Sequence, residues 1–348
     1  SLMPYVIAVS MITLAFFLML SIFVENPFRQ LWADNFTGNV TAALFQPPNT
    51  FLYVPPDGNG LNPLLRHPGM IIHPPLLYLG FVSFIIPYAF AMAALITGRT
   101  DDEWIRTTRR WTLVGWLFLS LGLILGGRWA YDVLGWGGYW GWDPVENAAL
   151  LPWLTGTAFL HSVIVQEKRG MLKVWNMVLI IATYALVIFG TFLTRSGVLS
   201  SVHAFAQSAI GPLFFGFISI TFVASMSLLF RRWNSLKSEA QMDSLLSREA
   251  AFLLNNFLFI GIAFATLWGT IFPLISELVT GQKVTVGPPY YNQVNGPMLA
   301  VLVLLMGIAP LVAWRKASAR SLGRLMWIPA MLTLVAGVLF YFLGARTP

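Results

Sequence analysis

A short stretch of the sequence concentrates flat aromatic rings among glycines. Residues 135–142 read GWGGYWGW and hold Trp136, Tyr139, Trp140 and Trp142. Glycine permits close backbone approach and unusual φ angles, and aromatic faces suit a flat, apolar ligand. The alternative is an interfacial belt, since Trp and Tyr favour the headgroup level of a membrane. A belt has no use for the glycines, so this aromatic segment (residues 135–142) is interpreted as a ligand platform.

Two histidines flank the aromatic segment and could bind a metal. His73 lies in IIHPPLLYLG and His203 in SSVHAF, and either alone could be an ordinary loop residue. Pro74 restricts His73 to extended backbone, and Pro75 suits the first turn of a helix. Haem is a flat, apolar macrocycle whose iron histidine commonly ligates. Two imidazoles beside a ring platform therefore predict a haem site.

A third histidine lies inside an apolar run. His161, in TAFLHSVIV, follows Glu146 by 15 residues, which is about 22 Å along a helix. An ionisable residue in a membrane span marks a functional site by default; the alternative is a hydrogen bond to a neighbouring helix. A haem ligated by His161 needs a second axial ligand. No other histidine lies within a span, because His67 belongs to a loop.

Charged residues frame the aromatic segment. Asp143, Pro144 and Glu146 have the N-cap, N1 and N3 spacing of a capping box, which predicts a helix that begins after Asp143. Arg128 and Arg195 begin the loops on either side of the platform. They either extend towards lipid headgroups from helix ends or pair with carboxylates such as haem propionates.

Composition assigns these residues to a membrane protein. The 348 residues are 57% hydrophobic and only 10% charged, with a mean hydropathy of +0.71, whereas soluble domains carry about 25% charged residues. Cysteine is absent, which excludes disulfides and thiolate ligands and makes a zinc site implausible. Nucleophile triads, phosphate-binding loops and dinucleotide motifs are also missing from the sequence.

Nine apolar runs have the roughly 17–25 residues that a membrane span needs. A spanning backbone must satisfy its own hydrogen bonds, so we expect an all-α, polytopic transmembrane bundle forming a single domain over residues 1–348. The chain begins Ser-Leu and its first apolar run is long enough to span, which favours an internal start in a longer protein over a cleaved signal peptide. The predicted spans are 4–24, 76–97, 111–127, 147–166, 174–193, 213–230, 250–272, 297–314 and 325–344.

The loops between these spans alternate in charge. Most of the 21 basic residues fall in loops 98–110, 167–173, 231–249 and 315–324, which the positive-inside rule places in the cytoplasm. The extracytoplasmic loops are then 25–75, 128–146, 194–212 and 273–296. The net charge of +7 therefore reflects topology rather than nucleic-acid binding.

The quoted motifs resemble a known family. WGGYWGWDP resembles the tryptophan-rich WWD motif of the haem-handling superfamily of cytochrome c maturation. NPLLRHPGMIIHPPLLYLGFV and GTFLTRSGVLSSVHAFA resemble the flanking signatures of its haem-lyase branch, the CcmF and NrfE proteins. The shorter CcmC proteins share a WWD motif and flanking histidines but lack these extended signatures. The resemblance runs from the first predicted helix to about the eighth.

The resemblance implies specific roles. His73 and His203 match the two extracytoplasmic histidines that ligate incoming haem b at the platform. His161 matches one of two transmembrane histidines that hold a resident b-type haem. The second of those histidines lies further towards the C-terminus in the family, in a region that this chain lacks.

The resemblance also implies an activity and partners. The chaperone CcmE would deliver haem, and thiols of the CxxCH motif of apocytochrome c would form thioether bonds with it. The other implied partners are a CcmH-type thiol-handling subunit and quinol as electron donor. The implied location is the bacterial inner membrane, with the active site on the periplasmic face. One alternative is a haem transporter, for which we would expect more than one histidine within the spans. The other is a CcmC-like docking subunit, a function that does not account for two histidines beside an aromatic platform.

Overall fold

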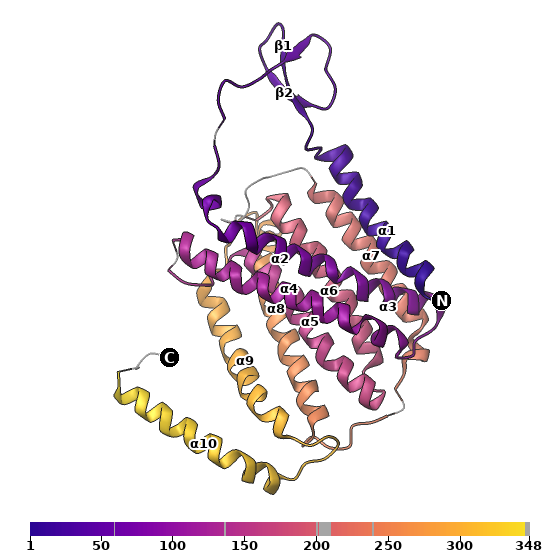
Figure 1. Ribbon diagram of the computed structural model, residues 1–348, viewed down its shortest axis with the longest axis vertical. Helices are drawn as coiled ribbons and strands as arrows, with labels where there is room; N and C mark the ends of the chain where they lie inside the picture. The colour runs from indigo at the N-terminus through magenta and orange to yellow at the C-terminus, as the bar shows by residue number, and fades with distance from the viewer. Residues whose placement is uncertain (59, 136, 200, 202–209, 239, 345–348) are drawn as a thin grey trace. The chain divides into compact units, whose positions relative to one another are not determined.

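The computed structural model describes residues 1–348 apart from 59, 136, 200, 202–209, 239 and 345–348. Within that part of the chain, nine helical segments are long and apolar enough to cross a membrane, which confirms the predicted multi-span, α-helical architecture. The helices of Figure 1 are α1 (Met3–Met19), α2 (Gly69–Ser83), α3 (Ile85–Thr97), α4 (Glu103–Val133), α5 (Pro144–Arg169), α6 (Lys173–Ser196), α7 (Gly211–Arg231), α8 (Arg248–Thr280), α9 (Pro288–Ile308) and α10 (Ala319–Phe342).

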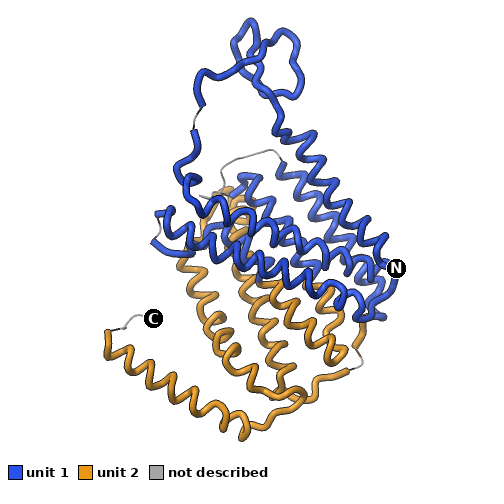
Figure 2. The backbone as a smooth tube through the Cα atoms, in the orientation of Figure 1, with its two compact units in different colours: residues 1–153, 180–235 blue, residues 154–179, 236–348 orange. Residues whose placement is uncertain are grey.

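The chain divides into two compact units, coloured separately in Figure 2. Unit 1 comprises residues 1–153 and 180–235, and unit 2 comprises residues 154–179 and 236–348. Helices α5 and α6 contribute residues to both units. The candidate residues divide accordingly: His73 and the described part of the aromatic segment belong to unit 1, and His161 belongs to unit 2.

The second span is two helices rather than one. Helix α2 ends at Ser83 and α3 begins at Ile85, with Phe84 between them. Pro87 has no N–H to donate to the carbonyl four residues earlier, so the helical hydrogen-bond ladder cannot run through unbroken. Every residue of α3 from Pro87 to Leu95 is buried, whereas α2 exposes much of its surface.

Glycines allow α2 and α4 to pack closely. A Cβ added at Gly80 would lie 2.5 Å from the backbone nitrogen of Leu119, and one at Gly122 would lie 2.8 Å from the backbone of Leu77. Membrane helices use small residues in this way, because dispersion contacts and short interhelical approaches replace the hydrophobic effect in lipid. The close approach brings α2 side chains directly against the backbone of α4.

The expected loop 25–75 contains a small antiparallel sheet that the sequence reading did not predict. Its strands are β1 (Gln30–Asp34), β2 (Val40–Ala43) and β3 (Thr50–Leu52), in the order β2-β1-β3. Trp32 lies opposite Leu52 and its indole Nε1 donates to Ala43 O at 3.1 Å. The β1–β2 turn is held by Asp34, whose Oδ1 accepts from the backbone nitrogens of Phe36 and Thr37 at 2.9 and 2.7 Å.

Two expected loops are shorter than predicted, because helices extend into them. Helix α4 continues to Val133, so Arg128 lies inside a helix and not at the start of a loop. The expected loop 273–296 shrinks to residues 281–287, because α8 continues to Thr280 and α9 begins at Pro288. One of its polar residues contacts α8: Asn295 Nδ2 donates to Thr266 Oγ1 at 3.1 Å. A contact with another helix thus places within the helices a buried polar residue whose polarity suggested a loop.

Candidate functional site

His73 lies inside α2, and the prediction of extended backbone ahead of the second helix is wrong. The helix begins at Gly69, where the Nδ1 of His67 accepts from Gly69 N at 3.1 Å. Backbone bonds from Met70 N to His67 O and from Ile71 N to Pro68 O form its first turn. Packing against α4 then overrides the preference of a residue before proline for extended backbone.

The imidazole of His73 is held in one tautomer by α4. Its Nδ1 lies 2.7 Å from Gly122 O. A carbonyl oxygen only accepts, so Nδ1 carries the proton and the lone pair of the neutral ring lies on Nε2. Metal-binding histidines use this arrangement, in which a hydrogen bond at one nitrogen orients the other towards the metal. His73 is therefore preorganised as an Nε2 ligand.

Trp129 and Gly126 fix the plane of the same ring. The indole of Trp129 is buried and stacks on His73 with ring centroids 6.1 Å apart and an interplanar angle of 11°. A Cβ at Gly126 would lie 2.5 Å from Cε1 of His73. Sequence reasoning missed both residues; the spacing of Gly115, Gly122 and Gly126 along one apolar run was the available signal.

The ring of His73 lines two neighbouring cavities in unit 1. The larger, about 270 Å³, is also bounded by Met70, Trp129, Thr194 and Arg195. The smaller, about 40 Å³, lies between His73, Leu123, Trp140 and Glu146. The structure therefore brings Trp140 of the aromatic segment next to His73. The larger volume lies just below the roughly 300–1,000 Å³ of typical ligand sites.

The other described rings of the aromatic segment point elsewhere. Tyr139 is 55% exposed and stacks on Tyr131 of α4, with centroids 4.5 Å apart. Trp142 meets Trp140 edge to face at 5.9 Å and 89°. Trp136 lies outside the described residues, as does His203. Among the described rings of the aromatic segment, Trp140 is thus the one that lines a cavity with His73.

The start of α5 has the hydrogen bonds of a capping box. Asp143 Oδ2 accepts from Val145 N at 3.0 Å, and Glu146 Oε2 accepts from Asp143 N and Gly141 N at 3.1 and 2.9 Å. Trp142 has a left-handed φ of 56°, which is strained for a residue with a bulky side chain. Asn147 Nδ2 donates to Trp142 O at 3.1 Å and holds that conformation.

The two arginines have different surroundings. Arg128 Nε lies 3.0 Å from Asp132 Oδ2 on the same helix, so a protein carboxylate already pairs with it. Arg195 lies in the last turn of α6 and lines the cavity of His73. Of the two, Arg195 is the one that lines the cavity beside His73.

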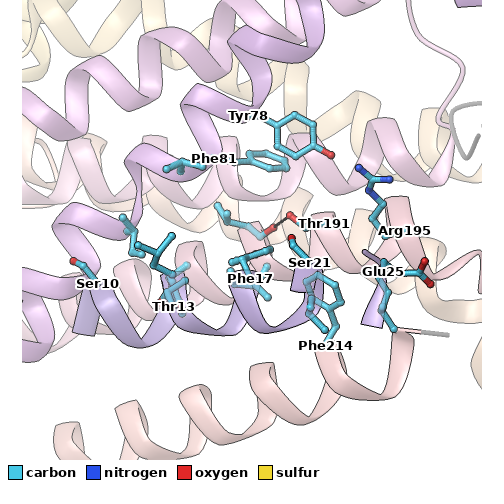
Figure 3. A pocket seen from close by; sticks show the side chains of 18 residues that line it. Ser10, Thr13, Phe17, Ser21, Glu25, Tyr78, Phe81, Thr191, Arg195 and Phe214 are labelled. Carbon is cyan, nitrogen blue, oxygen red and sulfur yellow. Dashed lines mark hydrogen bonds between the residues drawn. The ribbon is translucent and has the colours of Figure 1, made fainter. Parts of the chain in front are cut away.

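A larger cavity adjoins that of His73. About 720 Å³ lies among residues that include members of α1, α2, α3, α6 and α7. In Figure 3, Tyr78 and Phe81 line one side, and Arg195 and Glu25 lie at the end away from Ser10. Tyr78, Phe81 and Arg195 line both this cavity and the smaller one beside His73. No single sequence motif predicts this cavity, because its lining residues come from several helices.

His161 lies within α5 in unit 2 and is partly exposed. The rings of Phe252 and Phe259 of α8 lie 5.5 and 5.9 Å from its own. Its Nδ1 lies 2.7 Å from Asn255 Nδ2, while Asn255 Oδ1 is buried and has no hydrogen-bond partner in the part of the chain that the structure describes. A partly open imidazole with an amide behind it and aromatic rings beside it fits an axial haem ligand.

Comparisons with known proteins agree with the motifs. The family described as "Cytochrome C assembly protein" matches residues 1–199. A cytochrome c-type biogenesis protein CcmF of Pseudomonas aeruginosa is 44% identical over 320 residues, covering 92% of this chain and 45% of that protein. A cytochrome c-type biogenesis protein CycK of Bradyrhizobium diazoefficiens is 48% identical over 272 residues, covering 77% and 41%.

A solved structure agrees as well. The protein titled "Cytochrome c Heme Lyase CcmF" matches with a TM-score of 0.65 and 40% identity, covering 81% of this chain and 42% of that one. The chain therefore spans less than half the length of the relatives it matches. On these matches, the chain belongs to the cytochrome c assembly protein family, in its CcmF branch.

Proposed function

We propose that this protein is a haem lyase, which binds haem beside His73 and joins it to apocytochrome c through thioether bonds. One observation carries the proposal: the bond from His73 Nδ1 to Gly122 O puts the lone pair on Nε2 of a ring that lines a cavity. An iron ligand needs this arrangement, in which a hydrogen bond at one ring nitrogen leaves the lone pair on the other.

The substrate haem would lie beside Trp140, with His73 on one side of its iron and His203 supplying the opposite ligand. Arg195 would pair with a propionate, because guanidinium binds carboxylates with two parallel hydrogen bonds. Holding the haem flat and in one orientation lowers the entropic cost of the bond-forming step.

The reaction itself is redox-neutral. Each reduced CxxCH thiol of the apocytochrome adds across a haem vinyl group: sulfur bonds to one vinyl carbon and the proton goes to the other. The histidine of the same motif would then displace a protein ligand from the iron, and the product would leave. Haem would arrive on the chaperone CcmE, and a CcmH-type subunit would present the reduced thiols.

His161 would hold a resident b-type haem, which would supply one-electron transfer that keeps the substrate iron reduced, with quinol as the donor. Phe252 and Phe259 would exclude water from the imidazole. The multi-pass character supports a membrane location, and we assign the chain to the bacterial inner membrane with His73 on the periplasmic side, since the basic loops predict the opposite side as cytoplasmic.

Maturation of a reporter cytochrome c tests the proposal. Replacing His73 with Gly should abolish holocytochrome formation, and His203→Gly should do the same, while the absorption of haem at His161 persists. The matched control is His67→Asn, because asparagine can also accept from Gly69 N. Normal maturation by both glycine variants would refute the lyase site, and purified protein without any Soret band would point to a docking subunit.

A further inference from the structure

Asn255 is a buried amide in an apolar part of α8. Its Nδ2 lies 2.7 Å from His161 Nδ1, and its Oδ1 is buried with no hydrogen-bond partner among the described residues. A buried acceptor left without a donor costs about 1–3 kcal/mol. The two ends of an amide have nearly the same shape, so its orientation follows from hydrogen bonding.

The two amide orientations have opposite consequences for His161. With Nδ2 towards the ring, Nδ1 accepts and the proton lies on Nε2, where it blocks coordination. With the amide turned by 180°, Oδ1 accepts from Nδ1–H, and the lone pair lies on Nε2. Either orientation leaves one end of the amide without a partner among the described residues, so the tautomer that ligation at Nε2 requires decides between them.

We propose that Asn255 is the positioning residue for His161: its Oδ1 accepts the Nδ1 proton, fixes the ligating tautomer and tunes the iron bound at Nε2. The inference rests on the proposed function, in which His161 holds the resident haem. Phe252, Asn255 and Phe259 have the i, i+3, i+7 spacing of one helix face. Both Phe rings contact His161, so the face limits how far the imidazole can turn.

The strength of this acceptor should set the redox potential. An acceptor on Nδ1–H makes the imidazole a stronger donor, which stabilises ferric over ferrous iron. Asn255→Asp supplies a stronger acceptor and should lower the midpoint potential. Asn255→Leu removes the acceptor and should raise it. Loss of a hydrogen-bond partner behind a metal ligand typically changes metal affinity by about 10-fold or more. A 10-fold change in the ratio of the affinities for ferric and ferrous iron shifts the midpoint potential by about 59 mV.

The test is potentiometric titration of the purified protein with its resident haem, with low-temperature electron paramagnetic resonance of the ferric form. Variants are Asn255→Leu, Asn255→Asp and His161→Gly. Asn256→Leu is the control: Asn256 is a fully buried neighbour whose amide has no hydrogen-bond partner in the described structure. We expect the midpoint potential of Asn255→Asp to lie below that of the wild type and the potential of Asn255→Leu to lie above it. Asn256→Leu should have the wild-type potential.

The outcomes separate the two proposals. If His161→Gly loses the b-type spectrum but Asn255→Asp leaves both the potential and the ferric signal unchanged, Asn255 has no positioning role and the haem assignment stands. If His161→Gly keeps the spectrum, the resident haem lies elsewhere and both proposals fail. Should Asn255→Leu not accumulate in the membrane, the direction of the Asn255→Asp shift decides.

Discussion

The hydroxyl of Ser201 donates a 2.5 Å hydrogen bond to Asp143 Oδ2, the same oxygen that caps α5 by accepting from Val145 N. Ser201 is the last described residue before 202–209. The loop predicted to carry His203 is therefore tied to the helix start that follows the aromatic segment.

Breaking this bond should impair maturation. Ser201→Ala removes a hydrogen bond to a charged group, which contributes about 1.5–3 kcal/mol, so holocytochrome yield should fall roughly 10-fold or more, whereas any haem bound at His161 should remain. Ser201→Thr keeps the hydroxyl and should restore most of the yield. Wild-type yield from Ser201→Ala would show that anchoring at Asp143 is dispensable.

Filling the space beside His73 should displace its ring. Gly126→Ala places a Cβ 2.5 Å from Cε1 of His73, which the imidazole can relieve only by moving away from Gly122 O. We expect loss of holocytochrome with normal protein abundance. Gly216→Ala in α7 meets nothing within 4 Å and should be neutral or slightly stabilising. Equal maturation by both variants would contradict a fixed His73.

Truncating the capping box should lower stability. Glu146→Ala leaves Gly141 N and Asp143 N without their shared acceptor, at a cost of about 0.5–2 kcal/mol. Glu146→Gln keeps an acceptor oxygen and should lose less. Thermal unfolding of the detergent-solubilised protein compares the stabilities of the wild type and the two variants. Equal stability of Glu146→Ala and Glu146→Gln would contradict a capping role for Glu146.

Acid should weaken the turn between β1 and β2. Hydrogen bonds from Thr37 and Phe36 lower the pKa of Asp34, so the stabilisation exists above the ordinary carboxyl pKa and disappears as pH falls through the lowered one. Hydrogen exchange at Phe36 and Thr37 should be slower in the wild type than in Asp34→Asn near neutral pH. The difference should vanish in acid; a difference that persists there would exclude the carboxylate as its cause.

Hydropathy was sufficient to locate the spans, because apolar length is a local property of the sequence. The cap at Asp143 and Glu146 was equally accessible, since all its partners lie within a few residues. The conformation of His73 was not accessible in this way. It depends on the backbone of α4, 49 residues away, and proline preferences alone gave the wrong answer.

The same distinction explains the other differences. Asn295 of α9 suggested a loop because its partner, Thr266, lies on another helix. Asn255 could have been noticed as a polar residue within a span, but its relation to His161 requires α5 and α8 to be placed together. The role of Trp129 likewise depends on a partner from another helix, since its ring stacks on that of His73 in α2.

The two adjoining cavities of unit 1 share Tyr78, Phe81 and Arg195, and this makes them thermodynamically linked. A molecule in the larger cavity that selects one rotamer of Arg195 changes the free energy of binding beside His73. Reciprocity requires a molecule bound beside His73 to change the affinity of the first molecule by the same factor. Lipid or detergent composition therefore belongs among the variables of any binding measurement on this protein.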